Sequence, residues 1–146
     1  MSIDLSTPVA QRVAASFARQ GMMLHLEAKL VRVELGEVEI ALPYGDKVTQ
    51  QQGGFHGGAM GALADIAGGY AALTVVPEGM EVTTVEYKIN FLSSKQQGEL
   101  RAVGKVVKGG KRIVVTTAEV FHIDANGQQT LCAVMQQTLV PVAQTY

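Results

Sequence analysis

The chain has 146 residues, 47% of them hydrophobic, which suits one domain with a full core over residues 1–146 and is too short for two ordinary domains. Its 12 basic and 13 acidic residues leave a net charge of −1 with no basic segment, so neither a nucleic acid nor an acidic membrane surface is an expected partner. A single cysteine, Cys132, and the lack of a leader-like N-terminal pattern predict a cytoplasmic protein. The histidines and this cysteine are scattered, which predicts no metal site, and His25 and His122 are expected on strand surfaces.

The first third of the chain predicts a helix followed by a β-hairpin. Residues 8–20 have an amphipathic helical pattern and are followed by a glycine that would end the helix. From residue 24 the hydrophobic period changes to two, and residues 24–30 and 38–42 alternate on either side of a turn at Gly36. A polar connection over residues 43–54 then leads into the most apolar part of the chain.

Residues 53–73 form an apolar and glycine-rich run with a helical pattern and almost no polar side chain, except for Asp65, and the helix is expected to begin at about Gly57. A helix that is apolar on every side belongs in a core, where an unpaired carboxylate costs several kcal/mol. Asp65 is therefore either held by a backbone group or a lysine for structural reasons, or kept for chemistry.

Four alternating strands are expected after this helix, over residues 82–91, 100–108, 112–123 and 129–142. Gly109 and Gly110 predict a two-residue hairpin turn, and an Asn-Gly pair at residues 126–127 predicts another. The expected fold is α+β, with a short N-terminal helix and one long central helix wrapped by a curved antiparallel sheet of about six strands, the last four in a meander.

His56, Gly57 and Gly58 stand where the central helix begins, so their amides have no partner within the helix and suit an oxyanion. Glycine lets a substrate carbonyl approach such amides closely. A histidine at this position is, equally, a capping or packing residue. Gly57 and Asp65 are eight residues apart, roughly 12 Å along the helix, and cannot reach one carbonyl within one chain. If both act, two subunits with antiparallel helices must share each site.

The segment from Gln50 to Asp65, with G-x-x-H-G-G at residues 53–58 and the acid seven residues later, resembles the hot-dog-fold acyl-CoA thioesterases of the phenylacetate-degradation (PaaI-like) type. V-E-Y-K-I-N-F-L at 85–92, G-K-V-V-K-G-G-K-R at 104–112 and A-E-V-F at 118–121 extend the resemblance over residues 24–142.

The resemblance implies hydrolysis of an acyl-CoA or aryl-CoA thioester, with Asp65 as general base or nucleophile and the Gly57 amide as oxyanion donor. His56 would orient the carbonyl or the helix end, and Gln50 stands where relatives often carry asparagine. Thr84 would orient the water, although simple alternation places it on the strand face opposite Val85 and Tyr87. A β-bulge or the partner chain must then bring it to the site.

By the same analogy, coenzyme A would contact Gly58, Asn90, Lys108, Lys111 and Arg112, and no metal or redox cofactor would be needed. The expected assembly is a homodimer or a homotetramer built from two dimers. Two other functions remain open: a non-catalytic acyl-CoA sensor on the same fold, and a hot-dog hydratase or dehydratase. A sensor would not need a buried acid, and the hydratases have a different, proline-containing entry to the helix.

Overall fold

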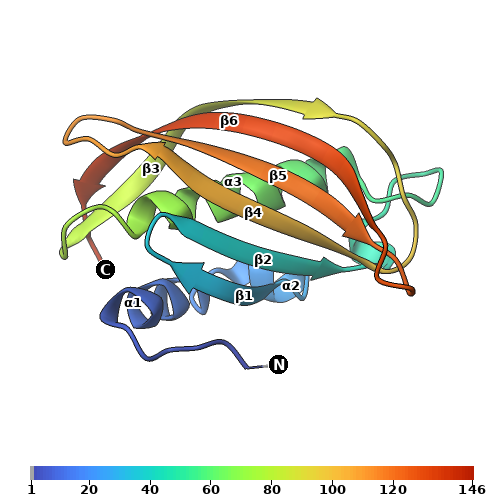
Figure 1. Cartoon of the computed structure of the whole chain (residues 1–146), viewed down its shortest axis with the longest axis horizontal. Helices are drawn as coiled ribbons and strands as arrows, with labels where there is room; N and C mark the ends of the chain where they lie inside the picture. The colour runs from blue at the N-terminus through green and yellow to red at the C-terminus, as the bar shows by residue number, and fades with distance from the viewer. Residues whose placement is uncertain (1) are drawn as a thin grey trace.

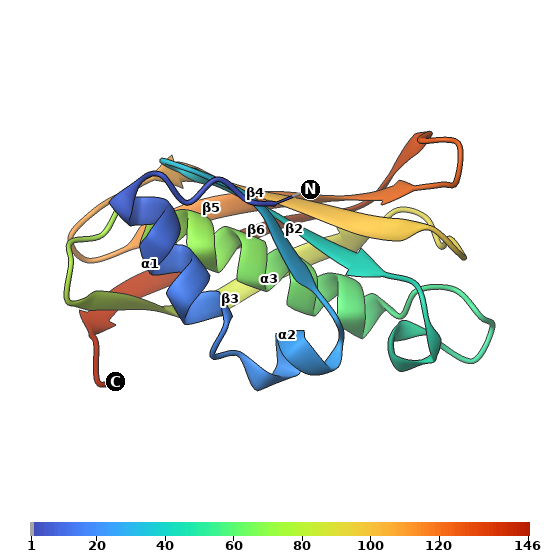
Figure 2. The ribbon, with the colours of Figure 1, turned by 90° about the horizontal axis from the view of Figure 1, so that it is seen from below.

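Helix α3 (Gly57–Leu73) lies along the concave side of one six-stranded antiparallel sheet in the computed structural model, which describes residues 2–146 (Figure 1). The strands are β1 (Lys29–Glu34), β2 (Glu37–Pro43), β3 (Met80–Phe91), β4 (Glu99–Lys108), β5 (Val114–Ile123) and β6 (Gln129–Ala143). A 3₁₀ turn, η1 (Asp46–Val48), precedes α3. Two short helices, α1 (Pro8–Phe17) and α2 (Gly21–His25), lie on the side of α3 away from the sheet (Figure 2). The expected α+β hot-dog architecture is confirmed.

The sheet can wrap α3 closely because the facing side chains of both are apolar and many of those on α3 are small. Strands β2 to β6 all contact α3, and the central strands alternate buried and less buried residues, as expected for one face against a core. Gly104 shows how close the layers come, since a Cβ there would overlap the backbone of Ala67 and Gly68. Cys132 is buried at 1% exposure, as a structural cysteine should be.

The strand order is β1-β2-β4-β5-β6-β3, so the predicted four-strand meander is wrong. Strand β4 pairs with β2, β5 and β6 follow in turn, and β3 pairs with β6 at the far edge. Local alternation identifies a strand but does not select its neighbour, and here β3 crosses to the opposite side of α3 before the chain returns to β4. One edge of β3 is consequently left unpaired.

The N-terminal segment also differs from the prediction. Helix α1 ends at Phe17, and Gly21 begins the short helix α2 rather than stopping the first helix. The alternation expected from residue 24 starts only at Lys29, because Leu24 is 61% exposed and belongs to α2. Glu27 has a φ of 62°, a left-handed residue that ends α2 and turns the chain into β1. The glycine pair after β4 lies in a five-residue connection, 109–113, instead of a two-residue turn.

Arg12 of α1 anchors this helix to the C-terminal end of α3. Its guanidinium donates to the carbonyl oxygens of Leu73 (3.4 Å), Val76 (2.9 Å) and Pro77 (3.1 Å), and also to that of Met80. The last carbonyls of a helix lack partners within it and carry partial negative charge, so a cation there satisfies both needs.

Arg12→Met is therefore expected to lower the free energy of unfolding by ~1–3 kcal/mol, because several partly buried carbonyls lose a charged donor while the aliphatic stem remains. Urea denaturation measures the change. Arg19→Met is the matched control, since this guanidinium only lies over the Tyr146 ring at 4.8 Å and its removal should cost less than ~1 kcal/mol. Equal losses in the two variants would contradict the anchoring role.

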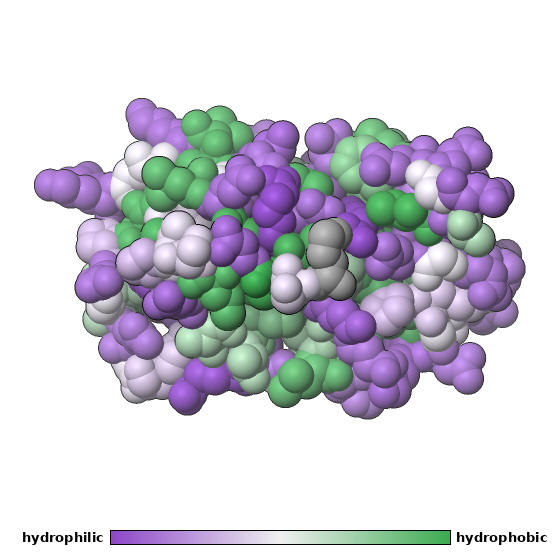
Figure 3. All heavy atoms as spheres, turned by 60° about the horizontal axis from the view of Figure 1, so that its bottom comes forward, coloured by the Kyte–Doolittle hydropathy of each residue, from purple (hydrophilic) through white to green (hydrophobic). Residues whose placement is uncertain are grey.

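The surface on the side of α1 and α2 shows polar side chains with apolar ones between them (Figure 3). Met22 and Leu24 of α2 are among the exposed large apolar residues. Within residues 2–146, no helix combines the length and apolar character needed to cross a membrane.

Candidate active site

The start of α3 is shaped by His56, which caps the helix. Its Nδ1 accepts a hydrogen bond from the Gly58 amide at 2.7 Å, so Gly58 is occupied and the expected capping role of His56 is present. The Gly57 amide has no acceptor among residues 2–146. One backbone donor at the positive end of the helix is thus free for a ligand oxygen.

The entry to α3 is held by the β3–β4 loop. The Phe55 amide donates to the Lys95 carbonyl at 2.9 Å, and Phe55 itself is 2% exposed. Nε2 of His122 lies 3.2 Å from the Gln96 carbonyl oxygen and 2.8 Å from that of Gln97. His122 is 5% exposed, so the expectation of a surface residue is wrong; it faces inward on β5 and fixes this loop.

Asp65, halfway along α3, is half-buried and is bound through one oxygen only. Its Oδ1 accepts from Thr84 Oγ1 at 2.8 Å and from Gln137 Nε2 at 2.7 Å. Gln137 is fully buried, and its own Oε1 accepts from Thr116 Oγ1 at 2.8 Å. The chain of donors fixes the carboxylate, while Oδ2 has no partner among residues 2–146.

A β-bulge at Val85 brings Thr84 to Asp65. Thr84 pairs with Leu139 and Glu86 pairs with Thr138, so Val85 is skipped and its side chain is 61% exposed. The extra residue shifts the alternation, and Thr84 shares the inner face of β3 with Tyr87. Of the two expected ways to bring Thr84 to the site, a β-bulge or the partner chain, the structure therefore has the bulge.

Gln137 was not foreseen, although the sequence contained a signal for it. It stands between Met135 and Leu139 at an inward position of β6, where alternation calls for an apolar residue. A buried amide must find partners, and those partners come from three other elements of the fold. Only the folded chain shows that one of them is Asp65.

The paired glycines in the second half of α3 offer a matched test of this arrangement. A Cβ on Gly68 would overlap Gln137 Oε1 and lie 2.7 Å from Thr116 Oγ1, whereas one on Gly69 meets only Leu139 Cδ2 at 3.9 Å. Gly68→Ala is expected to lower the free energy of unfolding by ~1–3 kcal/mol through overpacking. Gly69→Ala is expected to raise it by up to ~1 kcal/mol through helix propensity. Urea denaturation of both variants measures the two changes in the free energy of unfolding. Equal changes would show that the Gln137 side chain has room to move.

Gly57, Gly61 and Asp65 form one row on α3 at four-residue steps, and this row faces β3. An added Cβ would lie 3.3 Å from Phe91 Cζ at Gly57 and 3.1 Å from the Tyr87 hydroxyl at Gly61. Asp65 is therefore separated from the free amide of Gly57 by roughly 12 Å, two helical turns, as the sequence indicated.

The edge strand β3 exposes several apolar side chains beside this row: Val85 (61%), Tyr87 (43%), Phe91 (52%) and Leu92 (54%). An unpaired strand edge with apolar neighbours is a surface that proteins ordinarily cover. These inner-face aromatic residues do not pack on α3 as fully as expected from the sequence, because no further strand or helix of the same chain covers them.

A pocket of about 460 Å³ opens beside Asp65, within the size range of small-molecule sites. Its walls come from α3, from β3 and β6, from the end of α1 with the residues that follow it, and from the last residue of the chain. The lining residues are Ser16, Arg19, Gln20, Asp65, Ile66, Gly69, Tyr70, Glu81, Val82, Thr84, Leu139 and Tyr146. Asp65 thus borders a cavity with a mixed apolar and polar wall.

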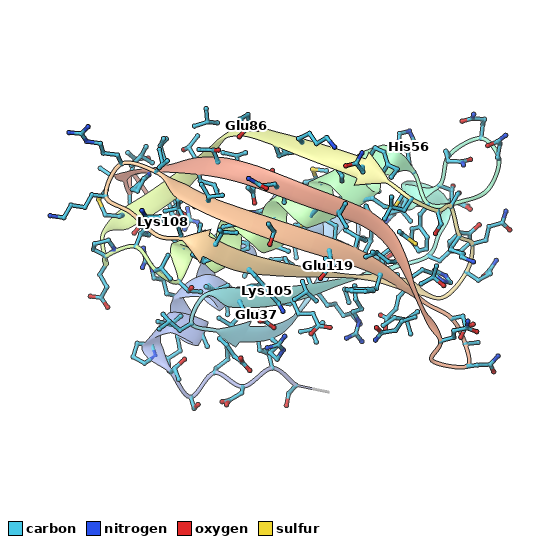
Figure 4. The ribbon with its side chains drawn as sticks, turned by 45° about the horizontal axis from the view of Figure 1, so that its top comes forward. Glu37, His56, Glu86, Lys105, Lys108 and Glu119 are labelled. Carbon is cyan, nitrogen blue, oxygen red and sulfur yellow. The ribbon has the colours of Figure 1, made fainter. Side chains whose placement is uncertain are left out.

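The remaining predicted residues lie away from Asp65. The Gln50 side chain accepts from the Gln52 amide within its own loop, and Asn90 is exposed on β3 beside Lys88. The predicted cations Lys108, Lys111 and Arg112 line a separate pocket of about 270 Å³. Lys108 and His56 lie at opposite ends of the molecule (Figure 4), so one chain does not bring the CoA candidates together. No cluster of three or more His, Cys, Asp or Glu side chains suited to a metal occurs within residues 2–146.

A long helix wrapped by one curved antiparallel sheet is the hot-dog architecture, and here the helix begins with glycines and carries an aspartate at its middle. Residues 52–127, more than half of the chain, match the model of the thioesterase superfamily. The chain belongs to this superfamily, in the PaaI-like type that its motifs indicated, and its class of reaction is thioester hydrolysis.

The relatives agree with this assignment. A Saccharolobus solfataricus protein provisionally named an esterase is 37% identical over 103 residues, which cover 70% of this chain and 71% of that protein. A 1,4-dihydroxy-2-naphthoyl-CoA hydrolase of Listeria monocytogenes is 31% identical over 91 residues, covering 62% and 74%. The crystal structure of a thioesterase family protein from Silicibacter pomeroyi superposes with a TM-score of 0.89 at 36% identity, covering 93% of this chain and 99% of that one. The PaaI protein of E. coli, at 20% identity and a TM-score of 0.82 over 97% and 99%, shares the fold.

Proposed function

We propose that this protein hydrolyses acyl-CoA thioesters to the free acid and coenzyme A. The observation that carries the proposal is the Asp65 carboxylate, which two donors hold by Oδ1 while Oδ2 has no partner among residues 2–146 and the residue lines a pocket. A sensor would gain nothing from a carboxylate oriented in this way. The name of the Listeria relative, a CoA-thioester hydrolase, supports the choice of CoA over other thioesters.

Asp65 acts on the thioester carbonyl in one of two ways. As general base, Oδ2 takes a proton from water, whose oxygen bonds to the carbonyl carbon. As nucleophile, Oδ2 itself bonds to that carbon, and water later cleaves the resulting anhydride. In both cases the carbonyl oxygen becomes an oxyanion, and the C–S bond then breaks to release the CoA thiolate. Thr84 and Gln137 orient the carboxylate for this attack, with no metal or redox cofactor in the reaction.

The free Gly57 amide stabilises the oxyanion, a donor of the kind worth ~3–4 kcal/mol. His56 supports it indirectly, because its Nδ1 occupies the neighbouring Gly58 amide and fixes the helix start. Gln50 acts at the same end of α3, through the loop that it braces.

The active unit is a dimer in which each site takes Asp65 from one chain and Gly57 from the other. The separation of roughly 12 Å along one helix requires this arrangement. The unpaired edge and exposed apolar side chains of β3 supply a surface for it, since β3 of two copies can pair antiparallel and place the two α3 helices side by side.

Coenzyme A would then reach the cations of the partner chain. The β4–β5 connection lies at the C-terminal end of α3, where a Cβ on Gly109 would lie 3.3 Å from Val75. In an antiparallel dimer this end would adjoin the helix start of the other chain, and Lys108, Lys111 and Arg112 would bind the CoA phosphates there. In this proposed dimer Gly58 and Asn90 would also contact the coenzyme A.

A spectrophotometric screen of acyl-CoA esters that follows the free thiol tests the proposal. Turnover is expected with at least one class of acyl-CoA and at a far lower rate with matched oxygen esters of p-nitrophenol. A protein that binds acyl-CoA tightly but releases no thiol would be a sensor, and the proposed function would be wrong.

A further inference from the structure

The pocket beside Asp65 has a polar wall opposite the catalytic carboxylate. Tyr70, five residues after Asp65 and 5% exposed, contributes its hydroxyl to this wall. Gln20 Nε2 donates to the Tyr70 hydroxyl at 2.9 Å, and Ser16 Oγ lies 3.1 Å from it. Burial raises the pKa of Tyr70, so it remains a neutral phenol at physiological pH.

The space between Asp65 and this wall is apolar and open. Ile66, Val82 and Leu139 line it, and Gly69 contributes no side chain. A Cβ on Gly69 would meet only Leu139 Cδ2, at 3.9 Å, so Gly69 itself crowds no other group in the pocket. An occupant therefore meets the carboxylate first, then an apolar stretch, then hydrogen-bonding groups.

Gln20 has unused hydrogen-bonding capacity at this wall. Its Oε1 has no partner among residues 2–146, although the residue is half-buried and lines the pocket. A ligand hydroxyl could donate to this oxygen without breaking a protein hydrogen bond. Arg19 and Glu81 also line the pocket with opposite charges, which favours a neutral polar group over an ionised one.

We infer that this pocket holds the acyl group of the substrate and selects acyl groups that carry a hydroxyl at the end far from the thioester. Gln20 is the residue that determines this specificity, and Tyr70 positions the Gln20 side chain. The inference rests on the proposed function for the place of the thioester.

The length of the preferred acyl group follows from the helix. Tyr70 lies roughly 7.5 Å beyond Asp65 along α3. An extended chain advances about 1.2 Å per bond, so about six bonds separate the reacting carbonyl from the polar wall. Hexanoyl-CoA and 6-hydroxyhexanoyl-CoA form a matched pair of probes, and adipoyl-CoA tests an ionised end.

The expected result is that the wild-type protein prefers 6-hydroxyhexanoyl-CoA over hexanoyl-CoA by about tenfold in kcat/KM, as one added hydrogen bond provides. Gln20→Leu should bring this ratio to about one, and Tyr70→Phe should lower it in part because Gln20 loses its support. Gln11→Leu, the same change at an exposed residue of α1 that does not line the pocket, should retain the full ratio. A wild-type ratio near one, an unchanged ratio in Gln20→Leu, or a preference for adipoyl-CoA would overturn the inference.

Binding to Asp65→Asn separates this inference from the proposed function. Calorimetry with this variant should show about tenfold tighter binding of 6-hydroxyhexanoyl-CoA than of hexanoyl-CoA, and Gln20→Leu in the same background should remove the difference. If the wild-type protein hydrolyses no ester of the acyl-CoA screen, these two included, but this difference in affinity is found, the proposed function fails and the pocket assignment stands. Equal affinities together with normal turnover would reject the pocket assignment and leave the proposed function in place.

Discussion

Asp65→Asn is expected to lower kcat/KM for acyl-CoA hydrolysis by about 10³-fold or more. The loss of a general base typically costs about 10²- to 10⁴-fold, and the loss of a nucleophile can cost more. An asparagine retains an oxygen that can accept from Thr84 and Gln137, so the fold and the pocket should persist. The amide can neither take a proton from water nor attack as an anion. Steady-state release of free thiol measures the effect.

Asp46→Asn is the matched control. Asp46 is exposed in η1 and does not line the pocket beside Asp65, so the same loss of one negative charge should leave turnover within about twofold. Urea denaturation should show similar stability for both variants and the wild type. Near wild-type activity in a folded Asp65→Asn protein would remove this residue from the reaction.

Mixing two inactive proteins is expected to restore activity if each site is shared. One partner carries Asp65→Asn and the other Gly57→Val, whose added side chain contacts Phe91 and covers the free amide. In a mixed dimer one site receives both changes and the other receives neither. Random exchange makes half of the dimers mixed, so activity should rise from near zero to about a quarter of that of an equal amount of wild-type protein.

The double variant, Gly57→Val with Asp65→Asn, provides the discriminating control. Mixed with the wild type, it places one defect in each site of a shared-site dimer, which should then be inactive. If both residues acted within one chain, the wild-type half of such a dimer would remain active. Native mass spectrometry verifies subunit exchange. The shared site would be rejected if the wild-type activity is fully retained in this control and no activity returns in the first mixture.

The central helix and the position of the acid on it were predictable because both are local features of the sequence. The apolar character of residues 53–73 requires a core position, and the glycines and the lone acid of this run are visible in the sequence. The structure has α3 at Gly57–Leu73 within this run, and His56 caps it. The distance between Gly57 and Asp65 also follows from helical rise alone.

The environment of Asp65 was decided by contacts between distant segments. Thr84 reaches it only because a bulge changes the alternation of β3, and simple periodicity places it on the wrong face. Gln137 is 72 residues away in sequence and meets Asp65 because β6 lies next to β3. Which partner satisfies a buried polar group depends on strand order, which period-two patterns do not encode.

The strand order and the pocket are likewise tertiary properties. Strand β3 could have paired with β4, its neighbour in the chain, but pairs with β6 across the sheet. The polar wall of the pocket joins Gln20, which lies between α1 and α2, to Tyr70 of α3, fifty residues apart. The sequence by itself determined which helix is buried and which acid it carries, because both follow from local periodicity; the folded sheet decided what surrounds that acid, because those contacts form only when the strands close around the helix.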